Sequence, residues 1–333
     1  MTELHVFADG GMAAAVIDRP GGEPAISTVQ SPQRAAGEAL IELAAAAINP
    51  VDLAIAQGGH LPGAEPDFPL VPGQEGVGRV LEAATLDQGT RVWFFTGRLF
   101  GPGSFAQRVS VSEDNVIPVP DDLSDTQAAS LGVAALSGWL AVQWRGQLQP
   151  GETVLVLGAT GVVGAVAVQA ALALGAARVV AAGRDQQALG QLRQLGAETV
   201  DLSAERTAGQ LAAVLADATG GGADLTIDPL WGRPGQAAVE AAGFGGRIVQ
   251  LGQSAGATSE LASIAVRGRM LSILGFTIWA VPHQAKTDAY LAMSSELVAG
   301  RLHVEHESVA LAKIADAWRR QARSPHRKLI LVP

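Results

Sequence analysis

The sequence predicts an α/β protein that joins a doubly wound parallel sheet to a smaller, irregular β-barrel. Beyond residue 150, apolar strand-like runs alternate with segments of helical length, which is the pattern of a parallel sheet with helices on both faces. Before residue 120, short strand-like runs are separated by paired glycines and prolines, which favours a barrel. A length of 333 residues also suggests two domains.

Composition and charge exclude several functions. The net charge of -9 argues against a nucleic-acid partner. The chain has no cysteine, so disulfides, thiolate metal sites, cysteine nucleophiles and iron–sulfur clusters are excluded. The N-terminus shows no signal-peptide pattern, and the apolar stretch Val162–Leu174 is too short to cross a bilayer. We therefore expect a soluble, cytoplasmic protein with no membrane partner.

The first 120 residues are expected to form the barrel. Ala39–Ala47 is apolar except for Glu42, which suits a half-buried strand. Val77–Glu82 and Arg91–Phe95 are further strand candidates. Turn residues such as Pro72 and Gly73 separate these runs.

The remainder of the chain alternates between helix and strand. Asp121–Arg145 is helical in pattern, with Ser124 as its N-cap. Strands are then predicted over 153–157, 178–182, 224–228, 246–251 and 270–275, and helices over 161–174, 186–195, 208–218 and 237–242. The last part predicts helices over 286–299 and 311–322 and strands over 303–306 and 328–332. Because of their spacing, His303 and His306 are expected to face opposite sides of a strand, which argues against a metal site there.

A glycine-rich turn between a strand and a helix is the strongest functional motif. The strand Thr153–Leu157 leads into Gly158, Gly161 and Gly164, and a helix of small residues follows. The three glycines allow a tight turn, a close approach of the backbone to a pyrophosphate, and packing of the helix on the strand. The motif predicts a Rossmann domain whose cofactor contacts are Gly158, Ala159, Thr160, Gly161, Val162, Val163 and Gly164.

The tip of the second strand indicates which dinucleotide binds. An NAD-dependent enzyme normally places an acid there to hold the ribose hydroxyls. Here the tip reads Gly183-Arg184, with Asp185 one residue further on. An arginine can pair with the 2′-phosphate of NADPH through charge-assisted hydrogen bonds. The sequence therefore predicts NADPH as the cofactor, with Gly183 and Arg184 as contacts.

Other candidate cofactor contacts follow later strands, at the carboxyl edge where ligands bind to such sheets. They are Asp228, Leu230, Gly252, Gln253 and Phe276. Trp231 is either part of this pocket or a packing residue.

The chain resembles a known family in motifs spread over nearly its whole length. The segments are Ile48–Asp52, with its Asn-Pro-x-Asp pattern, Val71–Gly78, with Pro-Gly-x-Glu, and Leu148–Glu152, Gly245–Val249 and Arg327–Leu331. They resemble those of the zinc-independent quinone oxidoreductase, or zeta-crystallin-like, branch of the medium-chain dehydrogenases/reductases. The resemblance implies a GroES-like domain over 1–120, a Rossmann domain over 121–282, a return to the first domain over 283–333, and a homodimer.

The same resemblance predicts that no zinc binds. Zinc-dependent members of this superfamily carry a histidine ligand where this chain has Gln74, and their cysteine ligands are absent. Without imidazole and thiolate donors, a tetrahedral zinc site is not expected. Activation of a carbonyl must then come from hydrogen bonds, which favours reduction of quinones or enones.

Two residues are predicted to take part in catalysis. The resemblance implies that Asn49 lies close to the nicotinamide as an orienting donor, although an Asn-Pro turn is the alternative. Relatives carry tyrosines where this chain has Ala54 and His60. His60 can donate a proton near neutral pH, or it can be a solvated loop residue.

The sequence therefore predicts an NADPH-dependent, zinc-free reductase that transfers hydride to a quinone or a conjugated carbonyl compound. An enoyl reductase of a biosynthetic pathway and a non-enzymatic NADPH-binding protein are the alternatives. A homodimer is expected to form through the edge strand near Met270–Gly275.

Overall fold

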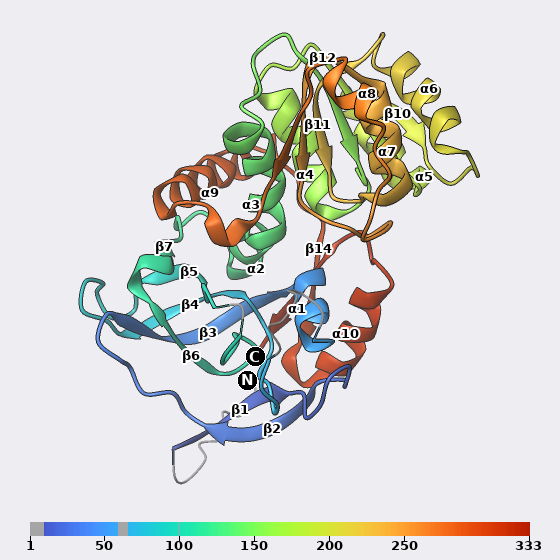
Figure 1. Cartoon of the computed structure of the whole chain (residues 1–333). Coiled ribbons are helices and arrows are strands. Elements are labelled where there is room, and N and C mark those ends of the chain that lie inside the picture. The colour runs from blue at the N-terminus through green and yellow to red at the C-terminus, as the bar shows by residue number, and fades with distance from the viewer. Residues whose placement is uncertain (1–9, 59–65, 99) are drawn as a thin grey trace. The chain divides into compact units, whose positions relative to one another are not determined.

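The computed structural model describes residues 10–58, 66–98 and 100–333 (Figure 1). Contacts within the chain divide it into two compact units. The first contains Met1–Val133 and Tyr290–Pro333, and the second contains Ala134–Ala289. Domain boundaries after residues 120 and 282 stay a prediction.

The first unit is built on an irregular, mostly antiparallel sheet. Within the described residues its strands follow the order β14-β15-β3-β4-β5-β7, and β6 also pairs with β3. The strands are β3 (Glu38–Ile48), β4 (Glu75–Glu82), β5 (Arg91–Phe95), β6 (Arg108–Ser112), β7 (Val116–Pro118), β14 (His306–Ala310) and β15 (Lys328–Val332). A separate antiparallel pair joins β1 (Gly11–Val16) to β2 (Ala25–Gln30), and the unit also holds the helices α1 (Pro50–Ala56), α2 (Asp125–Ser130) and α10 (Ile314–Ala322).

Strand β3 organises this unit. It pairs with β15, so that Ile48 lies opposite Leu329, and with β4 on its other side. β4 passes so close to β3 that a Cβ on Gly78 would lie 2.2 Å from the carbonyl oxygen of Glu42. The core against this sheet includes Ile41, Phe94, Phe105 and Leu331. The C-terminal strand therefore shares one sheet with strands from the start of the chain.

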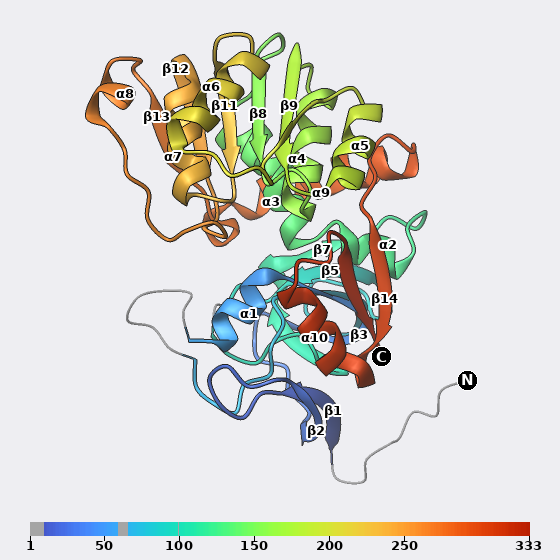
Figure 2. The ribbon, with the colours of Figure 1, turned by 90° about the vertical axis from the view of Figure 1, so that its right-hand side faces the viewer.

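The second unit is a doubly wound parallel sheet. Over residues 153–275, all of them described, the strand order is β10-β9-β8-β11-β12-β13. The strands are β8 (Thr153–Leu157), β9 (Arg178–Gly183), β10 (Glu198–Asp201), β11 (Ala223–Asp228), β12 (Ala242–Gln250) and β13 (Ser272–Gly275). The helices are α3 (Val133–Leu140), α4 (Val162–Ala173), α5 (Gln186–Gln194), α6 (Ala208–Ala218), α7 (Gly232–Ala241), α8 (Ser263–Arg267) and α9 (His283–Val298). Figure 2 shows helices on both faces of this sheet, and the strand order reverses between β8 and β11.

Most predicted elements are confirmed. The predicted bounds of β5, β8, α6 and β15 agree with the structure to the residue. Ser124 is the N-cap of α2, where its hydroxyl accepts from the backbone N–H of Gln127. The fold class, a Rossmann sheet joined to a GroES-like barrel, is also confirmed.

Other predicted bounds were wrong. The strand placed over His303–His306 begins only at His306, because pairing with β15 starts there, opposite Lys328. The helix over 121–145 is broken after Ser130 into α2, α3 and the π-helical turn Ala141–Arg145. The helix predicted from residue 237 begins at Gly232, because Asp228 closes the turn that leads into it. Sequence patterns did not reveal β1, β2, α1 or β10.

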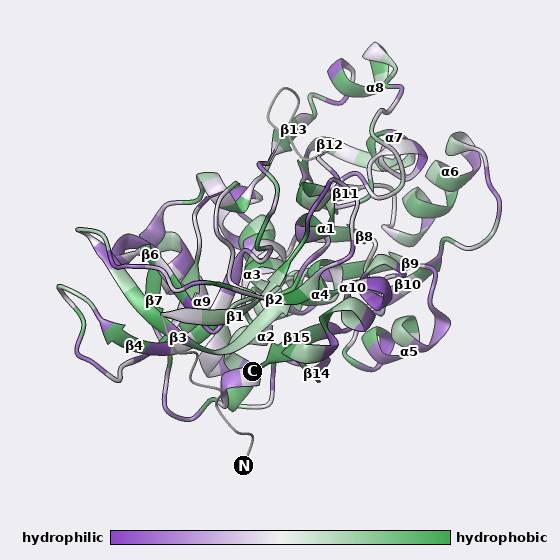
Figure 3. Cartoon of the chain, turned by 90° about the horizontal axis from the view of Figure 1, so that it is seen from below, coloured by the Kyte–Doolittle hydropathy of each residue, from purple (hydrophilic) through white to green (hydrophobic). Residues whose placement is uncertain are grey.

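Hydropathy is mixed along the helices rather than uniform. In Figure 3, α5 carries both hydrophilic and hydrophobic residues. Its buried residues Leu189 and Leu192 lie three positions apart, as on one face of a helix. Among the described residues, no helix is long and apolar enough to cross a membrane.

Candidate functional site

The glycine-rich turn has the geometry of a dinucleotide site. Gly158 follows β8 with φ at +59°, in the left-handed region that favours glycine. A Cβ on Gly164 would lie 2.4 Å from the carbonyl oxygen of Gly158, so this glycine lets α4 pack on the turn. Gly161 is the N-cap of α4, with no side chain to fill the space at the free N–H groups of the first turn. A pyrophosphate fits this arrangement, because free N–H groups and the helix dipole both attract anions.

Residues from other strands join this turn at the carboxyl edge of the sheet. A Cβ on Gly158 would lie 3.0 Å from the Leu230 side chain, which follows β11. A Cβ on Gly252, which follows β12, would lie 2.5 Å from the carbonyl oxygen of Pro229. Gly158, Leu230 and Gly252 therefore meet where the strand order reverses, which is the place where doubly wound sheets bind ligands.

Gln253 and Phe276 are held nearby by the ends of β12 and β13. The backbone oxygen of Gln253 accepts a hydrogen bond from Gly256, at 3.1 Å. The backbone N–H of Phe276 donates to Gln250 at 2.9 Å. The ring of Phe276 makes an edge contact with Trp144, with 6.4 Å between the ring centroids. A contact of either residue with the cofactor stays a prediction.

Asp228 shapes the loop after β11. Its Oδ1 accepts from the backbone N–H groups of Leu230 and Trp231, both at 2.8 Å. Its Oδ2 has no hydrogen-bond partner among the described residues, and burial raises the pKa of this carboxyl. Trp231 has a φ of +54°, a strained value for an aromatic residue. Asp228 thus holds a strained turn beside the predicted cofactor site.

The tip of β9 presents an arginine without an acid beside it. A Cβ on Gly183 would lie 2.5 Å from the Thr160 side chain, so the tip touches the glycine-rich turn. Arg184 is exposed and forms no ion pair or hydrogen bond with any described residue. Asp185 is the N-cap of α5, and its Oδ1 accepts from the backbone N–H of Ala188 at 3.0 Å. The neighbouring acid is therefore engaged in starting a helix.

A buried polar network lies in the first unit, around Glu75 on β4. Its Oε1 accepts from Asn49 Nδ2 at 2.8 Å and from Lys328 Nζ at 3.0 Å. Its Oε2 accepts from Trp93 Nε1 at 3.0 Å and from the backbone N–H of Val133 at 2.7 Å. Lys328 also donates to Asn49 Oδ1 at 2.6 Å. Glu75 and Lys328 are fully buried, so the charges are satisfied only by this network.

The two predicted catalytic residues are placed differently. Asn49 is buried and is the N-cap of α1, and both polar atoms of its amide bond to partners inside the barrel. Its amide therefore supports the fold, and a contact with the nicotinamide stays a prediction. His60 lies outside the described residues.

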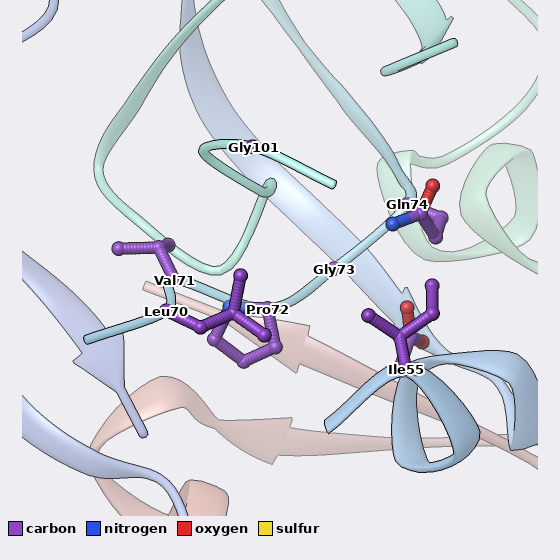
Figure 4. Close-up of a pocket in the computed structure, with 8 residues that line it drawn as sticks. Ile55, Leu70, Val71, Pro72, Gly73, Gln74 and Gly101 are labelled. Atoms are coloured by element: carbon purple, nitrogen blue, oxygen red, sulfur yellow. The ribbon is translucent and has the colours of Figure 1, made fainter. Parts of the chain in front are cut away.

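A small hollow lies beside this network (Figure 4). It has a volume of about 10 Å³ and is lined by Asp52, Ile55, Leu70, Val71, Pro72, Gly73, Gln74 and Gly101. Ile55 points from α1 toward Gln74 in Figure 4. Sequence reasoning did not single out Asp52, although its place three residues after Asn49 is the pattern of a reciprocal helix cap.

Gln74 stands at the position where zinc-dependent relatives carry a histidine ligand. It is buried, and its Oε1 accepts from Thr96 Oγ1 at 3.2 Å. No group of three histidine, cysteine or carboxylate residues is placed to hold a metal within the described ranges.

Comparisons with known proteins agree with both units. A family model described as an alcohol dehydrogenase GroES-like domain matches residues 35–121, and one described as a zinc-binding dehydrogenase matches 162–294. Quinone oxidoreductase-like protein 2 of Mus musculus is 30% identical, over 76% of this chain and 73% of its own length. The crystal structure of AibC has a TM-score of 0.85 at 25% identity, and the match covers 99% of both chains.

A much longer protein matches almost the whole chain. A phenolphthiocerol/phthiocerol polyketide synthase of Mycobacterium tuberculosis is 32% identical over 99% of this chain. The chain spans only 15% of the length of that synthase.

Fold, glycine-rich turn and relatives together define an oxidoreductase that works with a nicotinamide cofactor. The chain belongs to the medium-chain dehydrogenase/reductase superfamily, in its zinc-independent, quinone oxidoreductase-like branch.

Proposed function

We propose that the protein is an NADPH-dependent reductase that transfers hydride to a quinone or a conjugated carbonyl compound without a metal ion. The observation that carries this proposal is the combination of a complete dinucleotide turn with an amide, Gln74, where zinc-dependent relatives carry a histidine ligand. An oxyanion that develops on the substrate must then be stabilised by hydrogen bonds. When bound, the nicotinamide supplies the hydride.

Arg184 supports NADPH rather than NADH in this proposal. Its guanidinium is exposed and unpaired within the described part of the chain, and Asp185 is engaged in capping α5. A ribose 2′-phosphate at the tip of β9 would therefore meet a positive charge without a competing acid.

Arg184→Ala is expected to raise the Kd for NADPH about ten- to hundredfold, because a charged hydrogen bond is worth about 1.5–3 kcal/mol. The Kd for NADH is expected to stay unchanged. Fluorescence titration of both cofactors measures the effect, with Arg193→Ala on α5 as a control in the helix that follows. Equal binding of the two cofactors by the unmodified protein, together with a neutral Arg184→Ala, would refute the preference.

Enoyl reduction is the second candidate, and the match to the polyketide synthase favours it. In that reaction the hydride adds to the β-carbon of a conjugated enone, and negative charge again develops on the carbonyl oxygen. Both candidates thus make the same demand on the barrel.

One assay separates the candidates. NADPH oxidation is followed by absorbance with ortho- and para-quinones beside enals and cyclic enones, with EDTA present. Turnover of quinones supports the first proposal, and turnover of enones alone supports the second. Bound NADPH without turnover of any compound contradicts both.

The protein is also proposed to form a homodimer through β13, the outer strand of the parallel sheet. An unpaired strand edge can pair with its copy about a two-fold axis. Ile273 on this strand is exposed, and so are Phe244 and Met270.

Ile273→Lys is expected to convert a dimer to a monomer, because it places two positive charges at the two-fold axis. Sedimentation at micromolar concentration measures the mass. Leu195→Lys, at an exposed apolar residue after α5, is the control and should leave the mass unchanged. A monomeric unmodified protein would refute the dimer.

A further inference from the structure

Asp52 has a carboxyl oxygen that the fold leaves without a partner. Its Oδ2 accepts from the backbone N–H of Asn49 at 2.7 Å, which closes the cap of α1. Its Oδ1 is buried and has no hydrogen bond in the described part of the chain. Buried polar atoms are almost always bonded, so an unbonded one beside a cavity indicates a ligand. Asp52 lines the hollow described above.

The surroundings of Asp52 favour its neutral form. Burial raises the pKa of this carboxyl to about 7, and the negative charge of Glu75 on β4 acts in the same direction. The backbone N–H groups of Asn49 and Gln74 lower the pKa, and so does Lys328 on β15, whose charge is shared with Glu75. Because Oδ2 accepts a hydrogen bond from Asn49, the proton of the neutral acid lies on Oδ1. At and below neutral pH, Asp52 is thus a donor at the hollow.

Gln74 provides a second donor at the same hollow. Its Oε1 is occupied by the hydroxyl of Thr96. Its Nε2 has no hydrogen-bond partner within the ranges that the structure describes. The remaining walls include the apolar side chains of Ile55 and Leu70, which lower the local polarity and strengthen hydrogen bonds there.

The size of the hollow limits what enters it. A volume of about 10 Å³ has room for about one water-sized atom. A single oxygen atom that projects from a larger molecule fits, whereas a whole ring does not. Two hydrogen-bond donors select an oxygen that accepts, such as that of a carbonyl group.

We propose that this hollow is the carbonyl-oxygen subsite of the reductase, in which Asp52 is the catalytic acid and Gln74 is the second donor. This inference rests on the proposed function and names the group that completes the reaction. Hydride adds one hydrogen and an electron pair to the conjugated system, and the negative charge moves to the carbonyl oxygen. The proton on Asp52 Oδ1 then passes to that oxygen, which becomes a hydroxyl. Asp52 is left as a carboxylate and takes a new proton from water.

The pH dependence of turnover tests the role of Asp52. The acid is active when protonated, so kcat/KM of the unmodified protein is expected to fall above a pH of about 7. Asp52→Asn keeps the shape and the oxygen that caps α1 but has no proton to transfer. We expect kcat/KM to fall about 10²- to 10⁴-fold and the descending limb near pH 7 to disappear.

A matched variant controls for the change from carboxyl to amide. Glu113 accepts from the backbone N–H groups of Ala84 and Thr85 at 2.7 and 2.8 Å, on an exposed part of the same unit. Glu113→Gln is expected to leave kcat/KM and its pH profile unchanged. If Asp52→Asn keeps the unmodified rate, or keeps the descending limb, Asp52 is not the acid.

A measurement without turnover separates this inference from the proposed function. Infrared spectra are taken of 2-cyclohexenone bound in the presence of NADP⁺, so that no hydride is available. The carbonyl stretch of the bound probe is expected to shift to lower wavenumber at pH 6 and less at pH 9 with the unmodified protein. In Asp52→Asn the shift should no longer depend on pH. A shift that is absent, or equally dependent on pH in both proteins, overturns the subsite even if quinones or enones are reduced. A pH-dependent shift without turnover of any substrate would retain the subsite and reject the proposed function.

Discussion

Lys328→Met is expected to lower the free energy of unfolding of the barrel unit by about 3–5 kcal/mol. Methionine keeps most of the side-chain length but removes the charge. The Glu75 carboxylate then stays fully buried without its counter-ion, and Asn49 Oδ1 loses its donor. Urea unfolding followed by tryptophan fluorescence measures the loss, because Trp93 donates to the same carboxylate.

Two further variants show whether the loss comes from the unpaired charge. Lys313→Met makes the same substitution at an exposed lysine before α10 and should change stability by less than about 0.5 kcal/mol. Glu75→Gln combined with Lys328→Met removes both charges and should recover part of the loss. A Lys328→Met protein within about 1 kcal/mol of the unmodified one would mean that Glu75 and Lys328 do not act as a buried pair.

The parts that sequence reasoning predicted well are those that local patterns determine. The turn from Gly158 to Gly164 joins a strand directly to a helix, so its glycines indicate both the geometry and the cofactor class. Strand β8 and helix α6 were predicted to the residue because their apolar patterns have clear ends.

The buried network was not predicted, because its members are distant in the sequence. Lys328 and Glu75 lie 253 positions apart and meet only because β15 pairs with β3 and β3 pairs with β4. No periodicity reveals such a contact. One sign was visible, since Lys328 directly precedes the apolar run of β15 and Glu75 directly precedes the glycine-rich, apolar start of β4. Charged residues in such positions need a buried partner.

Capping residues explain two further differences. Asp185 was considered as a possible competitor for the ribose, but the polar segment that follows it starts α5, and Asp185 caps that helix. Asn49 was weighed as a turn residue or a nicotinamide contact, and α1 between it and Gln57 was missed because the helix is only seven residues long. Recognising Asn49 and Asp52 as a reciprocal cap would have located both the helix and the hollow.

Gly161→Ala is expected to weaken NADPH binding about a hundredfold or more while leaving the protein folded. Gly161 has a φ of -87°, which alanine adopts without strain. A Cβ there would meet no described atom closer than the carbonyl oxygen of Gly158, at 3.6 Å. The methyl group would instead occupy the space at the N-terminus of α4 where the pyrophosphate is proposed to lie. Losing two charged hydrogen bonds of about 1.5–3 kcal/mol each accounts for the size of the effect. Calorimetric titration measures the Kd.

Gly164→Ala is the contrasting variant. Its Cβ would lie 2.4 Å from the carbonyl oxygen of Gly158, so α4 must move away from the turn, and the thermal midpoint should fall. Gly161→Ala should keep the unmodified midpoint without cofactor and lose most of the increase that NADPH produces in the unmodified protein. If Gly161→Ala binds NADPH normally, the pyrophosphate does not approach this residue. The cofactor would then have to lie elsewhere along the carboxyl edge of the sheet, and Arg184 would lose its proposed partner.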